Sequence, residues 1–238
     1  MEVKELEKMI REQEGSLSLA FPALMRKVYI WMALALALTG LTAYGIASNT
    51  NLAFALISNR MLFWGIAIAE FSLVIFLSAR IHKLSLTTAT LSFLLYSVLN
   101  GVTMSIIFLA FTASSIATTF YITAGTFGVM AVYGYVTKAD LSKLGNILMM
   151  ALLGLIVALV VNIFLRNSML DLIISGIGVI LFTGLTAYDS QKIKTALAMQ
   201  EYPDETAQKV ALIGALNLYL DFINLFLYLL RFFGRSNN

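Results

Sequence analysis

Long apolar runs dominate the sequence, and each is long enough to cross a lipid bilayer. A helix that crosses about 30 Å of hydrocarbon needs roughly 20 mostly apolar residues. Seven such runs occur, at residues 28–48, 61–79, 86–111, 115–136, 144–165, 172–191 and 209–231. They lack the alternation of apolar and polar residues that marks a membrane β-barrel. Since helices and closed barrels are the only structures that span a bilayer, the sequence predicts an all-α integral membrane protein with seven transmembrane helices.

Composition supports this class and excludes others. Of the 238 residues, 60% are hydrophobic and only 12% are charged, with a mean hydropathy of +0.87, which lies outside the range of soluble domains. The chain has no cysteine, so it forms no disulfide and uses no thiolate chemistry. The net charge of +3 does not imply a nucleic-acid partner in a membrane protein, where the position of the basic residues is informative instead.

The distribution of basic residues predicts the orientation, because Lys and Arg accumulate in cytoplasmic loops. With seven spans, twelve of the sixteen Lys and Arg fall on the side of the N-terminus and four on the other side. We therefore expect a cytoplasmic tail at residues 1–27, a transmembrane domain at 28–231, and a C-terminal tail at 232–238 on the opposite side. Arg231 and Arg235 favour an alternative, in which a re-entrant last segment returns the C-terminus to the cytoplasm.

The last span carries a polar stripe. Asn217, Asp221, Asn224 and Tyr228 follow one another at steps of four, three and four residues, so they share one helical face. A carboxylate at membrane depth is costly, faces the interior of the bundle, and marks a functional site with a partner. The expected partner is Asp189, near the end of the sixth span.

The register of the last two spans allows this pairing. Pro203 marks the turn between them, with Asp189 14 residues before it and Asp221 18 residues after it. At about 1.5 Å per residue the two carboxylates differ in depth by about one helical turn. The pairing requires the sixth helix to continue past residue 191. If it ends there, Asp189 is an ordinary interfacial residue.

Paired carboxylates at this depth predict a proton-dependent site. Two carboxylates close together in a low-dielectric medium repel each other, so we expect Asp189 and Asp221 to share one proton. Once both are ionised they would attract a hard cation such as calcium, which prefers oxygen ligands. Asp189 and Asp221 are therefore the candidate metal ligands.

A third acidic residue, Glu70, lies near the middle of the second span with no basic residue within one helical turn. It too is expected to face the bundle interior. In the third span, Tyr96, Asn100 and Thr103 share one face, a pattern typical of polar contacts that hold membrane helices together.

Several motifs carry a family resemblance: Tyr188-Asp189-Ser190-Gln191 closing the sixth span, Asp221 in the last, Asn100-Gly101 in the third, and Arg26-Lys27-Val28-Tyr29 opening the first. Over essentially the whole chain the sequence resembles the Bax inhibitor-1 family of seven-span membrane proteins. The resemblance implies a central last helix ringed by the other six, an aspartate pair that acts as a pH sensor, and a pH-dependent calcium leak.

The resemblance also implies a basic residue of the second span that latches onto the aspartates. Arg80 is the best match, and Glu70 is the second candidate for a latch or counter-charge. The candidate pore-lining polar residues are Asn217, Asn224, Tyr228 and Asn100. We expect calcium and protons as transiently bound ions, the lipid bilayer as partner, no resident cofactor and no enzymatic activity. In a bacterium the location would be the plasma (inner) membrane.

Two other functions fit parts of the sequence. Aspartates on the sixth and seventh spans, the first preceded by tyrosine, resemble the dyad of presenilin-type intramembrane proteases. Against this, Leu218-Tyr219-Leu220 precede Asp221 where those enzymes carry Gly-x-Gly, and no proline follows Pro203. The third possibility is a regulatory membrane scaffold that transports nothing and binds partners through its tail.

Overall fold

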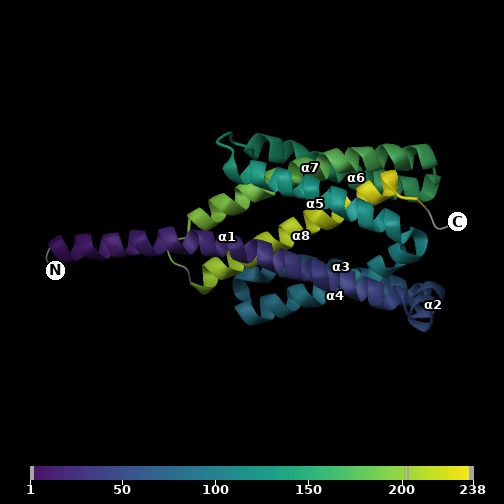
Figure 1. The fold of residues 1–238 in the computed structure, drawn as a ribbon, viewed down its shortest axis with the longest axis horizontal. Coiled ribbons are helices and arrows are strands. Elements are labelled where there is room, and N and C mark those ends of the chain that lie inside the picture. The colour runs from purple at the N-terminus through teal and green to yellow at the C-terminus, as the bar shows by residue number, and fades with distance from the viewer. Residues whose placement is uncertain (1–2, 201, 203, 236–238) are drawn as a thin grey trace.

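The computed structural model describes residues 3–200, 202 and 204–235, with side chains described from Phe21 onward. Throughout these residues the regular structure is helical (Figure 1), with elements α1 Val3–Ala47, α2 Thr50–Ser58, α3 Arg60–Arg80, η1 Ile81–Lys83, α4 Leu86–Ala110, α5 Ala113–Val136, α6 Ser142–Leu165, α7 Ser168–Ala198 and α8 Glu205–Phe233. Seven of the described helices are long and apolar enough to cross a bilayer. The prediction of an all-α protein with seven spans is confirmed.

The spanning helices alternate in direction, so the two termini lie at opposite ends of the bundle (Figure 1). At the N-terminal end, the side chain of Glu205 at the start of α8 accepts a hydrogen bond from the backbone N–H of Leu86 at the start of α4, at 2.9 Å. At the C-terminal end, the carbonyl of Arg235 accepts from the backbone N–H of Thr112, at 3.2 Å. Because α8 crosses the bundle as one continuous helix, the re-entrant alternative does not describe this fold.

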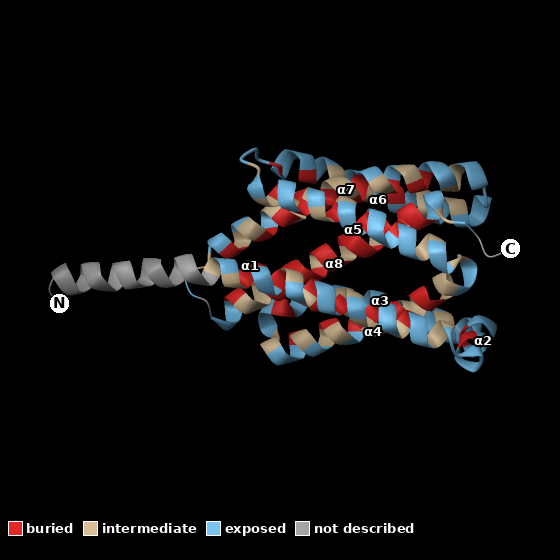
Figure 2. Ribbon diagram, in the orientation of Figure 1, coloured by how far each residue is buried: buried red, intermediate tan, exposed pale blue. Residues whose placement is uncertain are grey.

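Helix α8 occupies the centre of the bundle. In its most apolar stretch 67% of the residues are buried, against 6% in α3 and in α6, and Figure 2 shows buried residues along most of its length. Helices α1, α4, α5 and α7 pack directly against α8, whereas the principal contacts of α3 and α6 are with α4 and α7. The central position of the last helix is confirmed, but two of the other six helices lie outside the ring.

Glycine allows the closest helix crossings. A methyl group at Gly134 of α5 would overlap the carbonyl oxygen of Ala187 in α7, and one at Gly101 of α4 would overlap Thr42 of α1. Small residues of this kind let membrane helices approach closely enough for dispersion contacts to hold them together. Gly125 and Gly154 face open space instead, so they make no comparable contact.

Two segments differ from the predicted spans. Helix α7 continues beyond the predicted end at residue 191 and reaches Ala198, because the polar residues that close the apolar run remain compatible with a helix outside the hydrocarbon. The predicted loop between the first two spans contains α2. The side chain of Asn49 caps its N-terminus by accepting hydrogen bonds from the backbone N–H groups of Asn51 and Leu52.

We predict that Gly134→Ala destabilises the protein by about 1–3 kcal/mol, because the added methyl group forces α5 away from α7. Gly125→Ala on the same helix is the matched control, and it should be neutral or slightly stabilising because alanine favours helix in open space. Thermal unfolding of both variants in detergent provides the measurement. Equal transition midpoints would show that the α5–α7 crossing tolerates a side chain.

Candidate functional site

The antiparallel packing of α7 against α8 brings the two aspartates together. Gly214 lies against Ile193 on one side of the pair, and Gly178 lies against Tyr228 on the other. Asp189 is half-buried, and Asp221 is only 5% exposed. Their carboxyl groups lie within hydrogen-bond distance of each other. A hydrogen bond between two carboxyl groups needs a donor, so the two can be bonded to each other only when one of them carries a proton.

The environment of the pair contains little that could neutralise two negative charges. Among the described residues, the second carboxyl oxygen of Asp221, Oδ2, is buried and has no hydrogen-bond partner. The positive charge that acts on Asp189 is that of the exposed Lys192. The ammonium group of Lys192 lies 5.8 Å from the centre of the Tyr188 ring. A buried acceptor without a donor is costly, so Asp221 has unused capacity for a proton or a cation.

The remaining stripe residues of α8 differ in what they offer. Asn217 is half-buried, and Asn224 donates from Nδ2 to the carbonyl of Leu220 at 2.8 Å. The ring of Tyr228 stacks on Phe182 of α7 with centroids 5.7 Å apart and lies over Gly178. Tyr228 therefore fills the α7–α8 interface toward the C-terminal end, and any ion path along this face has to pass it.

The predicted latch, Arg80, makes no described bond to this pair. It is the last residue of α3 and is exposed, and within the described part of the chain no hydrogen bond or ion pair joins it to Asp189 or Asp221. Arg80 ends α3, whose main packing partner is α4, and the short helix η1 that follows it contacts α8.

Glu70 belongs to a second polar centre. Its carboxylate accepts hydrogen bonds from Nδ2 of Asn100 and from Oγ1 of Thr103, the latter at 3.0 Å, so it points at α4. Asn100 therefore donates to Glu70, and within this network it makes no hydrogen bond to Asp189 or Asp221. The contact also ties the outer helix α3 to the bundle through polar groups.

This centre continues through a tyrosine that the sequence pattern did not identify. Oδ1 of Asn100 accepts from the hydroxyl of Tyr219 at 3.0 Å, and that hydroxyl lies 2.7 Å from Oγ1 of Thr39. Thr39 in turn donates to the carbonyl of Ser97 at 2.9 Å. Tyr219 lies two residues before Asp221, on another face of the helix among apolar side chains, so periodicity gave no signal for it. The network joins α3, α4, α8 and α1.

The donor set limits what can bind at the aspartate pair. Among the described residues there is no cluster of three or more His, Cys, Asp or Glu side chains that could hold a metal ion. A cation between Asp189 and Asp221 would therefore find two carboxylates as its acidic ligands.

Seven spanning helices, of which the last is central, with a carboxyl pair between the last two, define an integral membrane protein with an intramembrane polar site. Residues 22–238 match the family described as "Inhibitor of apoptosis-promoting Bax1", and the chain belongs to this Bax inhibitor-1 family. The resemblance read from the sequence is thus confirmed.

Bacterial relatives align with nearly the full length of the chain. The inner membrane protein YbhL of Escherichia coli is 49% identical over 211 residues, which are 88% of this chain and 90% of the relative. An uncharacterised protein of Borreliella burgdorferi is 47% identical over 214 residues, 90% of this chain and 92% of its own. An uncharacterised protein of Deinococcus radiodurans is 42% identical over 228 residues, which are 96% of this chain and 96% of the relative.

We predict that Tyr219→Phe destabilises the protein by about 1–2 kcal/mol, because the buried Oδ1 of Asn100 loses its hydrogen-bond donor and Thr39 loses the hydroxyl group beside it. Tyr228→Phe is the control: its hydroxyl has no hydrogen bond within the described residues, so the loss should be small. Thermal unfolding of both variants in the same detergent measures the two losses of stability. A loss for Tyr228→Phe as large as that for Tyr219→Phe would contradict the role assigned to the network.

Proposed function

We propose that this protein is a pH-sensitive calcium leak pathway of the membrane, gated by Asp189 and Asp221. The observation that carries the proposal is the contact between the two carboxyl groups inside the bundle. Its membrane setting is supported by the seven spans and by the relative that is named an inner membrane protein. Calcium is the transported species here and not a resident cofactor.

The proton content of the pair would set the packing of α7 against α8. With one shared proton, the carboxyl groups bridge the two helices by a hydrogen bond. With both groups ionised, two like charges face each other in a medium of low dielectric constant, where repulsion is much stronger than in water. The ionised pair would then separate, draw in Lys192, or bind a cation. Each outcome changes the contact between the helices.

A change in this contact would act on the ion path through Tyr228. Its ring fills the interface seven residues beyond Asp221 on the same face, so a shift of α8 relative to α7 moves the ring out of its place over Gly178. Calcium would then meet the oxygens of the two aspartates and of Asn217 and Asn224. Several weak oxygen sites in series suit conduction better than one tight site.

Glu70 would have a separate role in this proposal. Its bonds to Asn100 and Thr103 hold α3 against α4, and Tyr219 extends the same network to α8. In this proposal Glu70, and not Arg80, is the group that fastens the second span to the bundle. A movement of α8 at the gate would therefore be transmitted to α3 through these hydrogen bonds.

The gate is tested by calcium flux into proteoliposomes measured across a range of pH. Asp189→Asn and Asp221→Asn each keep the side-chain size but remove one ionisable group, so the remaining carboxylate no longer has a like charge opposite it. Each single variant should lose most of the pH dependence, and the double variant should add little, because one coupled unit is already broken.

Asp171→Asn is the matched control, since this residue pairs with Arg231 at 3.4 Å near the C-terminal end of the bundle. Its pH profile should match that of the wild type. Wild-type profiles in both gate variants, or effects that simply add in the double variant, would refute gating by the pair. An absence of flux in the wild type with no partner present would favour the scaffold function.

The orientation is tested by cysteine labelling, which the natural absence of cysteine makes simple. A membrane-impermeant maleimide applied to intact cells should label Asn238→Cys, because the C-terminus is expected outside. Lys138→Cys, between α5 and α6 at the N-terminal end of the bundle, should react only after the membrane is opened. The reverse pattern would place the N-terminus outside.

A further inference from the structure

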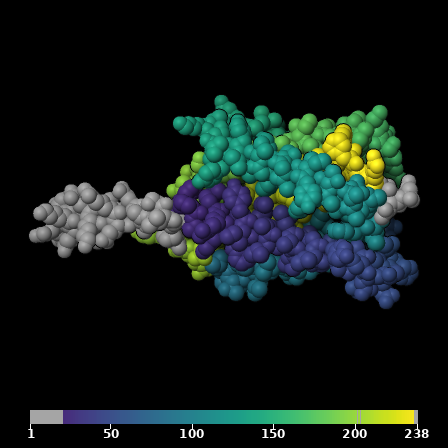
Figure 3. Space-filling view, in the orientation of Figure 1, coloured from purple at the N-terminus to yellow at the C-terminus, as the bar shows by residue number. Residues whose placement is uncertain are grey.

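A seam runs along the bundle between α1 and α5. Within the described residues these two helices barely touch, although both pack against α8, and part of α8 is visible between them in Figure 3. The seam contains two cavities of similar size. The cavity toward the C-terminal end, here the outer cavity, has a volume of about 380 Å³, and the one toward the N-terminal end, here the inner cavity, about 410 Å³.

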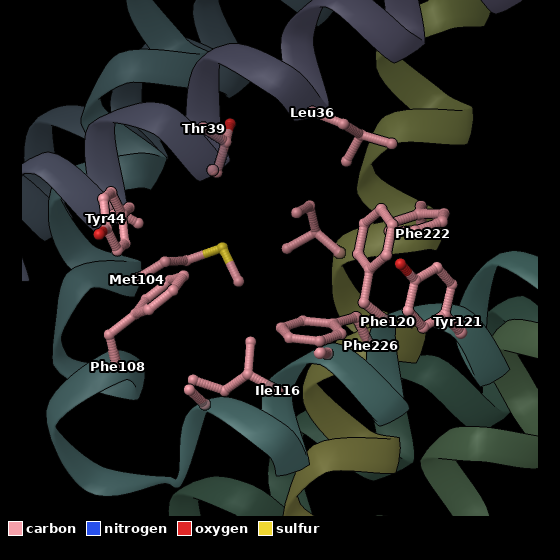
Figure 4. A pocket seen from close by; sticks show the side chains of 15 residues that line it. Leu36, Thr39, Tyr44, Met104, Phe108, Ile116, Phe120, Tyr121, Phe222 and Phe226 are labelled. Carbon is pink, nitrogen blue, oxygen red and sulfur yellow. The ribbon is translucent and has the colours of Figure 1, made fainter.

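The two cavities are separated by aromatic rings. Phe222 of α8 lies edge-to-face against Phe120 and Phe127 of α5, with centroids 5.6 and 5.4 Å apart. Phe120 and Phe222 line the outer cavity (Figure 4), and Phe127 lines the inner one. Each cavity therefore has its own opening toward the surroundings of the bundle, marked by the exposed Tyr121 in one and the exposed Val132 in the other.

The two cavities differ in charge. Apolar and aromatic side chains, with a few hydroxyl groups such as that of Thr39, line the outer cavity, and none of its lining residues is basic. The inner cavity is lined by Pro22, Met25, Arg26, Tyr29, Phe127, Gly128, Ala131, Val132 and Tyr135. Its walls are thus mostly apolar, with one guanidinium group at the rim.

Arg26 has no anionic partner among the side chains that the structure describes. Its neighbour Lys27 is turned to α8, where its ammonium group donates to Gln208 at 3.2 Å. A second cation is close to the cavity, because the ammonium group of Lys194 donates to the carbonyl of Tyr135 at 2.7 Å and lies 5.2 Å from the centre of its ring. The rim of the inner cavity therefore carries positive charge that no described carboxylate neutralises.

We propose that the inner cavity binds an anionic phospholipid from the leaflet at the N-terminal end of the bundle. At this depth the apolar molecules that can fill a lateral cavity are lipid acyl chains, and about 410 Å³ lies in the usual range for a ligand site. The guanidinium of Arg26 favours a head group with net negative charge, whose phosphate has no cation of its own beside it, as basic pockets between transmembrane helices do. The outer cavity takes an acyl chain without selecting its head group.

The bound lipid touches the support of the gate. Ser190, next to Asp189, donates to the carbonyl of Ala131 at 2.7 Å and lies 3.5 Å from the hydroxyl of Tyr29. Ala131 and Tyr29 both line the inner cavity. Any effect of the lipid on flux rests on the proposed function, but the lipid site itself does not.

Native mass spectrometry of the purified full chain tests the site. The probes are dioleoyl phosphatidylglycerol, which is anionic, and dioleoyl phosphatidylcholine, which has the same chains and no net charge. The wild type should retain the anionic lipid preferentially. Arg26→Gln should reduce that preference about fivefold, the effect expected for one basic residue. Arg60→Gln, at the opposite end of the bundle, should leave the preference unchanged.

Filling the cavity provides an independent test. A side chain at Gly128 would enter open space, so Gly128→Leu should displace the anionic lipid while keeping the fold. Gly154→Leu on α6 and Gly40→Leu in the outer cavity also meet open space and should retain the preference. Thermal unfolding shows which of these variants are folded. If Gly128→Leu does not fold, the result for Arg26→Gln alone tests the lipid site. Equal retention of both lipids by the wild type, or an unchanged preference in Arg26→Gln, would overturn the proposal.

Discussion

The contact between Asp189 and Asp221 is the constraint on which the rest of the structure depends. Lipid solvates neither group, so each needs the other or a proton. The contact holds two helices of 31 and 29 residues in one register, and glycines at 178 and 214 let them lie close on either side of it. Removing the pair would leave an interface of apolar side chains, which lipid chains can contact as favourably as a neighbouring helix can.

The second polar centre solves the same problem on another face of α8. Tyr219 connects α8 to α4 and α1 through hydrogen bonds, and Glu70 adds α3. Because the hydrophobic effect does not drive helices together in lipid, two polar contacts on two faces explain why α8 stays central. One centre contains two carboxyl groups facing each other, and the other contains one carboxylate that is already satisfied by donors. Only the first would bring two like charges together when its groups are ionised.

Much of this could be predicted from the sequence, because lipid imposes strict rules on length and polarity. Apolar runs identify the spans, and spacing places Asp221 on one face with Asn217 and Asn224. What could not be predicted depends on which helix is the neighbour. The helix that Arg80 ends packs mainly against α4, a neighbour that the sequence of this helix does not specify.

The glycines and Tyr219 illustrate the same limit. Gly134 and Gly125 lie on one helix and look equivalent in sequence, yet only Gly134 meets another backbone. Tyr219 was overlooked because a single hydroxyl on an apolar face produces no periodic pattern. Its importance arises from Asn100, 119 residues earlier in the chain. Such pairings are set by tertiary packing and leave no local trace.

The length of α7 gives the protein a sidedness. A helix of 31 residues is about 46 Å long, about half as long again as the hydrocarbon is thick. Asp189 lies nine residues from the end of this helix at Ala198, or about 14 Å, close to the depth at which hydrocarbon gives way to head groups and water. In the proposed gate, protons would therefore reach the pair from the compartment at the N-terminal end and not from the far side of the membrane.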